Sequence, residues 1–119
     1  MGVQVSDVRA FLDDLPESLV SDNVIQKHID SATALVNAVK SSQASQEQVD
    51  QAILVQASYQ TLLAYATSVE RSMGTVPAPI LRHLEYLREL AQTWLTIVRR
   101  SSPPKFVPVM GGIDDEQSE

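Results

Sequence analysis

Apolar residues recur at every third or fourth position through most of the first hundred residues, which is the spacing of one face of an α-helix. The pattern predicts a short helix over residues 7–13, with Ser6 as its N-cap. A second helix is predicted over residues 23–40, where one face is apolar and the other polar, and Ser21 or Asp22 would cap it. We therefore expect this second helix to lie on the surface of the fold.

Ser45 and Gln48 predict the start of a third helix. They have the form of a capping box, in which each side chain accepts a hydrogen bond from the other residue's backbone amide. The helical pattern then continues to Met73, and Gly74 supplies the C-terminal stop. Apolar residues are spread around this helix, and many side chains along it are small, which permits close approach of other helices. We expect the third helix to be central or buried on two sides.

A fourth helix is predicted to follow Pro77 and Pro79, which stand where a first helical turn tolerates proline. Apolar residues recur at helical spacing from there to about residue 100. Roughly 22 residues at about 1.5 Å each give a helix about 33 Å long. Trp94 has apolar neighbours at helical spacing, so we expect it to anchor the packing of this helix.

Residues 101–119 break the helical pattern. Three prolines exclude a continuous helix here, yet the segment carries apolar side chains that a merely solvated tail would lack. These candidate partner-binding residues are Phe106, Val107, Val109, Met110 and Ile113. The sequence thus predicts an all-α fold, a small bundle of one short and three long helices in residues 1–100, with an extended Pro/Gly/acidic C-terminal arm over residues 101–119.

Length and composition narrow the class of protein. A chain of 119 residues corresponds to one domain, and 44% hydrophobic with 20% charged residues is ordinary for a soluble globular protein. The absence of cysteine excludes disulfides, a thiolate nucleophile and cysteine-ligated zinc. Because no apolar run approaches the eighteen or so residues that cross a bilayer, we expect no membrane partner.

Charge is placed unevenly along the chain. The net charge is −6, and the final nine residues hold four of the acidic groups, so residues 1–110 carry only −2. Nucleic-acid recognition usually needs a stripe of Lys and Arg, and none is visible. The adjacent pair Arg99 and Arg100 is better placed to complement the negative end of a helix dipole than to contact phosphate. We therefore expect no sequence-specific nucleic-acid binding.

The sequence offers little that could carry catalysis. His28 and His83 fall on different predicted helices, and neither has a second ligand at metal-binding spacing. Glu85 and Glu89 lie four residues apart on the fourth helix, which is typical of a solvated face. Neither a nucleophile elbow nor a phosphate loop is present. We predict that the protein is not an enzyme and has no catalytic residue, cofactor or metal.

Three stretches of the chain, together with the arm, resemble a known family of proteins. They are residues 5–13 (VSDVRAFLD), the helix beginning near Val24, and the alanine-rich residues 51–66 (QAILVQASYQTLLAYA). In helix order and general texture, over most of its length, the chain resembles the head–tail connector (adaptor) proteins of tailed bacteriophages and related tailed viruses.

The resemblance implies a structural neck protein. Its copies would form a homo-oligomeric ring, expected to be dodecameric, on the portal protein, and would present a surface to the next neck or tail protein. The arm would dock on the portal or on a neighbouring subunit, and DNA could pass through a ring that has no basic lining to hold it. The protein would be assembled in the host cytoplasm and reside in the virion at the head–tail interface.

Two other function classes fit the same sequence. A helical adaptor or chaperone subunit of a cellular complex would use the same bundle and arm without closing a ring, and the mass of its assemblies would separate the two. An enzyme whose site is assembled from distant residues is the third class. Turnover that is lost when His28 or His83 is replaced would favour it.

Overall fold

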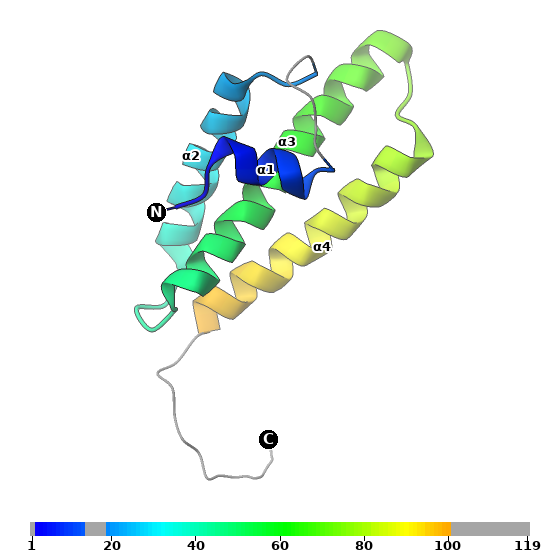
Figure 1. Cartoon of the computed structure of the whole chain (residues 1–119). Coiled ribbons are helices and arrows are strands. Elements are labelled where there is room, and N and C mark those ends of the chain that lie inside the picture. Colours follow the sequence, from blue (N-terminus) through cyan, green and yellow to red (C-terminus); the bar gives the residue numbers. More distant parts are fainter. Residues whose placement is uncertain (1, 14–18, 101–119) are drawn as a thin grey trace.

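The computed structural model describes residues 2–13 and 19–100, and Figure 1 shows how they are arranged. The helices are α1 (Val5–Phe11), α2 (Asp22–Val39), α3 (Gln46–Met73) and α4 (Ala78–Arg100). The described residues contain no strand. The prediction of an all-α bundle of one short and three long helices is confirmed. The predicted arm, residues 101–119, lies outside the described residues.

The first helix begins and ends earlier than predicted. Its N-cap is Gln4 rather than Ser6, because the Asp7 carboxylate accepts a hydrogen bond of 2.9 Å from the Gln4 backbone amide and so caps the helix two residues earlier. The helix ends at Phe11 rather than at Asp13, whose φ of 59° lies in the left-handed region that a helix cannot include. The predicted boundaries of this helix were therefore wrong by two residues at each end.

The predicted caps of the next two helices are confirmed. The Ser21 hydroxyl accepts from the Val24 amide at 3.4 Å at the start of α2. Ser45 and Gln48 form the reciprocal capping box of α3, with distances of 3.1 Å and 3.0 Å. Gly74 ends α3 with a φ of 83°, the left-handed conformation that favours glycine at this position.

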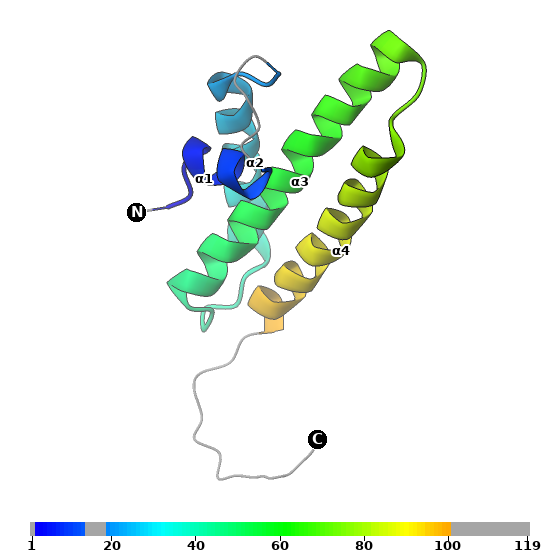
Figure 2. The ribbon, with the colours of Figure 1, turned by 45° about the vertical axis from the view of Figure 1, so that its right-hand side comes forward.

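The central helix of the fold is α3, which contacts each of the other three helices. Figures 1 and 2 show α2 and α4 along its two sides, with α1 crossing over one face. Its buried residues are spread around the helix, from Val49 through Val55 and Ser58 to Ala66, which confirms the prediction of burial on two sides. On α2, by contrast, the buried residues form a single stripe: Ile25, Ile29, Ala32 and Val36.

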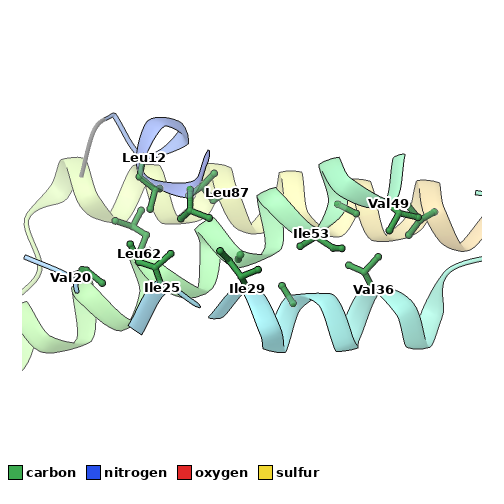
Figure 3. Packing of buried hydrophobic residues seen from close by; sticks show 14 residues of the cluster. Leu12, Val20, Ile25, Ile29, Val36, Val49, Ile53, Leu62 and Leu87 are labelled. Atoms are coloured by element: carbon green, nitrogen blue, oxygen red, sulfur yellow. The ribbon is translucent and has the colours of Figure 1, made fainter. Parts of the chain in front are cut away.

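The core is a continuous cluster of apolar side chains along α3, and α1 covers one side of it (Figure 3). Leu12, from the end of α1, points toward Leu87 of α4. Val8, Ile25 and Leu87 are completely buried, and full burial of such a side chain contributes about 1.5–3 kcal/mol. Buried alanines such as Ala32, Ala52 and Ala57 let the helices approach closely, as the small side chains predicted.

Packing of α4 depends less on its tryptophan than the sequence suggested. Trp94 is only partly buried and lies against the edge of the core cluster, whereas Leu87 and Val98 are fully enclosed. The helix faces α3 along one stripe, and α2 contacts it far less than α3 does. The main apolar anchors of α4 are therefore Leu87 and Val98, with Trp94 in a supporting position.

The end of the α3–α4 hairpin that carries Gly74 projects away from α1 and α2 in both views (Figures 1 and 2). Large apolar residues remain exposed along this hairpin, among them Leu63, Leu81 and Met73. At the opposite end, the Ser41 amide donates a hydrogen bond of 2.8 Å to the Val98 carbonyl. That bond satisfies one of the last carbonyls of α4 and holds its end beside the loop that leads into α3.

Candidate docking surfaces

None of the five predicted partner-binding residues falls within the described part of the chain. Phe106, Val107, Val109, Met110 and Ile113 lie beyond Arg100, the last residue of α4. The structure does locate the point from which they depart. Because the Ser41 amide bonds the Val98 carbonyl, the chain leaves α4 beside the loop that precedes Gln46. The candidate site must therefore be built from the surfaces of the bundle.

One groove lies between α1 and the first half of α3, with a volume of about 580 Å³. It is lined by Gly2, Val3, Asp7, Ala10, Phe11, Glu47, Asp50, Gln51 and Leu54. Val3, Phe11 and Leu54 pack against the core cluster but remain partly exposed, so they form an apolar floor. We call this feature the α1–α3 groove.

The charge of the α1–α3 groove is one-sided. Asp7, Glu47 and Asp50 place three carboxylates on its rim, and the described residues that line it include no Lys, Arg or His. Asp7 accepts the Gln4 amide, and Asp50 accepts the Gln46 side-chain amide at 2.8 Å. Both partners are neutral, so the negative charges are not compensated by these bonds. The groove thus combines apolar contact area with a negative potential.

The position of α1, one wall of this groove, is held by Arg9. Its guanidinium donates to the Asp22 carboxylate at 2.6 Å and 3.1 Å, and to the Val20 carbonyl at 2.8 Å. The same contact satisfies a carbonyl just before α2 begins. Because these three bonds join α1 to the start of α2, they fix the angle at which α1 crosses α3.

A second groove, of about 610 Å³, lies between α2 and α3 toward the projecting end of the hairpin. Its lining includes His28 from α2 and Leu63 and Arg71 from α3. The lining is therefore cationic or neutral where that of the α1–α3 groove is acidic. We call it the α2–α3 groove.

A third and smaller groove, of about 220 Å³, runs between α3 and α4. Tyr59, Leu63, Leu81 and Leu84 give it an apolar lining, to which Glu85 and Arg88 add one charge of each sign. Leu63 borders both this groove and the α2–α3 groove, so exposed apolar surface continues from one to the other. Contiguous apolar surface of this kind is typical of protein interaction sites.

The residues weighed for catalysis are not brought together. His28 lies on α2 in the second groove, and His83 lies on α4 without lining any of these grooves. Glu85 and Glu89 are exposed on α4, as predicted for a solvated face. Over residues 2–13 and 19–100, no cluster of three or more His or acidic side chains could hold a metal ion.

Two side-chain hydroxyls of α3 are buried without a hydrogen-bond partner in the described part of the chain. They belong to Ser58 and Thr61, which are both fully buried. Their positions within the helix packing give them no access to a substrate. They are packing residues with an unsatisfied polar atom, and no local pattern in the sequence predicts that their hydroxyls lack a partner.

The α1–α3 groove was not predicted from sequence. Asp7, Glu47 and Asp50 come from segments forty residues apart, and only the crossing of α1 over α3 brings them to one rim. A sequence signal did exist in the Gln4–Asp7 capping pair, which sets where α1 begins. That pair was overlooked because Ser6 is the more usual capping residue.

Comparison with protein-family models, with curated proteins and with solved structures finds no match to this chain. Among the described residues, no helix is long and apolar enough to cross a membrane. The features that bear on function are thus the bundle, its grooves and the composition of residues 101–119.

Proposed function

We propose that the protein is a structural neck protein of a tailed virus, a head–tail adaptor that links the capsid vertex to the tail. In this role its copies form a ring on the portal protein, expected to be dodecameric, and contact the next neck or tail protein. The observation that carries the proposal is the combination of a four-helix bundle with a following segment rich in proline and apolar residues. The resemblance to connector proteins rests on this order of helices and on the arm that follows them.

The arm is the part of the chain best suited to docking on the portal or on a neighbouring subunit. Pro103, Pro104 and Pro108 reduce the conformational freedom that the segment loses on binding. Phe106 and Met110, with the other apolar residues of the arm, can fill grooves on a partner while main-chain groups add to a partner's sheet. The bundle holds the start of the arm at the end of α4.

The surface chemistry of the bundle supports assembly rather than reaction. The α1–α3 and α3–α4 grooves offer exposed apolar contact area, edged in the first by carboxylates, which suits contact with another polypeptide. The near-neutral charge of residues 1–110 suits a ring through which DNA slides, since a basic lining would retain it. The proposed location is the head–tail interface of the virion, after assembly in the host cytoplasm.

The proposal is tested by the mass and shape of the assembled protein. Native mass spectrometry and negative-stain microscopy of the purified full chain should show closed rings, and immunogold labelling of particles that contain it should mark the site between capsid and tail. A matched chain that ends at Arg100 should keep the same far-UV spectrum and a similar melting transition but lose partner binding. Open or small assemblies, with no label at the neck, would instead favour an adaptor or chaperone of a cellular complex.

A further inference from the structure

The α1–α3 groove lies at the same end of the bundle as the point where the chain leaves α4. Its acidic rim begins at Glu47, in the first turn of α3, and the loop before that turn is bonded to α4 through Ser41 and Val98. In Figure 1 the end of α4 lies beside the start of α3. Residues that follow Arg100 therefore start close to this groove.

The chemistry of the groove matches one short stretch of the arm. Lys105 is the only cation after Arg100, and it is followed directly by Phe106 and Val107. A lysine could lie against the carboxylates of the rim while the aromatic and branched side chains cover the apolar floor. Five residues beyond Arg100 span at most about 17 Å, which is enough to cross the end of α3.

We propose that the α1–α3 groove is a binding site for a peptide segment that joins a cation to an aromatic residue, and that residues 105–107 of the same chain occupy it in the free subunit. The short connection to α4 keeps the local concentration of this segment high, so that modest contacts suffice to hold it. The prolines before Lys105 restrict the connection further.

Two of the other grooves fit this segment less well, and a further one of about 390 Å³ on α4, around Thr93 and Ile97, has one carboxylate, Glu89, against three on the rim of the α1–α3 groove. The α2–α3 groove carries Arg71 and His28, which do not attract a lysine. The α3–α4 groove lies beside Leu81 to Arg88, at least twelve residues before the end of α4, or about 18 Å along its axis. The acidic residues from Asp114 onward are repelled by the rim of the α1–α3 groove, so only the start of the arm is suited to it.

This inference goes beyond the proposed adaptor function and does not depend on it. It concerns the chain before any partner binds. If the arm later docks on a portal or a neighbouring subunit, that partner must compete with the α1–α3 groove for residues 105–107. Assembly would then release the groove as well as engage the arm.

The absence of cysteine in the chain allows a direct test by disulfide formation. A double variant, Gln51→Cys with Pro108→Cys, places one thiol in the α1–α3 groove and the other just past the docking residues. The matched control is Gln60→Cys with Pro108→Cys, because Gln60 is also a partly buried glutamine of α3 but lines the α2–α3 groove. Circular dichroism should first show that both variants keep the helical content of the parent.

On mild oxidation, the Gln51 pair should form an intramolecular disulfide about tenfold faster than the Gln60 pair, with the product remaining a monomer. Adding Lys105→Glu to the Gln51 pair should reduce the rate several-fold, because it replaces attraction to the rim with repulsion.

Equal rates for the two pairs, or no effect of Lys105→Glu, would overturn the proposal. Disulfide-linked dimers in place of monomers would assign the segment to a second copy and overturn it too. If the chain never forms rings, the adaptor function is wrong, but faster disulfide formation by the Gln51 pair would still support docking of residues 105–107 in the α1–α3 groove.

Discussion

Arg9 and Asp22 form an ion pair of 2.6 Å that joins α1 to the first turn of α2 across thirteen residues of sequence. The Arg9 side chain is only 17% exposed, whereas that of Asp22 is 59% exposed, so the pair sits at the margin of the bundle. Solvent screens such a pair, and its contribution to global stability is small. Its main effect is local, because it joins α1 to the start of α2, while the apolar side chains Val8 and Leu12 anchor α1 to the core.

Replacing this carboxylate tests the local role. Asp22→Asn should lower the free energy of unfolding by no more than about 1 kcal/mol but should speed amide hydrogen exchange throughout α1. The matched control is Asp30→Asn on the exposed face of α2, where the carboxylate accepts a hydrogen bond of 3.0 Å from the Gln26 side chain of the same helix. Exchange in α1 that is no faster in Asp22→Asn than in Asp30→Asn would show that the ion pair does not position this helix.

The C-cap of α3 offers a second test. Gly74 has a φ of 83°, and a Cβ atom added there would meet nothing within 4 Å among the described residues. Any cost of Gly74→Ala must therefore come from backbone conformation rather than from a clash, and we expect about 1 kcal/mol of destabilisation in chemical denaturation. Gly74→Asn is the control, because asparagine tolerates the left-handed region, and it should recover part of the loss. An alanine variant as stable as the parent would mean that the turn has relaxed to another conformation.

The helices and their ends were largely predictable because the signals that set them are local. Ser45 with Gln48 and the glycine at position 74 each act within one turn, so the sequence contains the whole interaction. The start of α1 was missed because its cap uses Gln4, an uncommon N-cap, together with Asp7. These differences change the bounds of one helix and leave the class of fold unchanged.

Burial and grooves were less predictable because they depend on how helices cross. Trp94 lies on the apolar stripe of α4. How deeply each residue of that stripe is buried depends on which other helices pack against it. The α1–α3 groove depends on the crossing of α1 over α3, which no repeat or spacing encodes. The five partner-binding residues of the arm stay a prediction, since they lie outside the described residues.

The difference between Leu87 and Trp94 can be measured directly. Leu87→Ala removes a fully buried side chain from the core and should cost about 2–5 kcal/mol in the free energy of unfolding. Trp94→Ala would cost about 3–5 kcal/mol for a buried indole, and its partial exposure places the expected loss at or below the lower end of that range. Leu81→Ala, at a side chain that is 48% exposed, is the control and should cost least. If Trp94→Ala were the most damaging of the three, the tryptophan would be the principal anchor after all.

The unsatisfied hydroxyl of Thr61 gives the last prediction. Thr61 is fully buried in α3, and its hydroxyl has no hydrogen-bond partner in the described part of the chain. A buried polar group without a partner loses its hydration and gains nothing in return, so replacing it with a methyl group of similar shape removes an unfavourable contribution. Thr61→Val should therefore stabilise the protein by about 1 kcal/mol and raise the melting temperature by a few degrees.

The matched control for this substitution is Thr67→Val, six residues further along α3. The Thr67 side chain is exposed, and its hydroxyl donates to the Leu63 carbonyl at 2.9 Å. Valine at this position therefore removes no unsatisfied polar group, and we expect no gain in stability. Both variants make the same change in helix propensity, because threonine and valine are similar in that respect. The difference between their stabilities thus isolates burial of the hydroxyl. A destabilised Thr61→Val beside an unchanged Thr67→Val would show that the buried hydroxyl does find a partner, such as an ordered water between α3 and its neighbours.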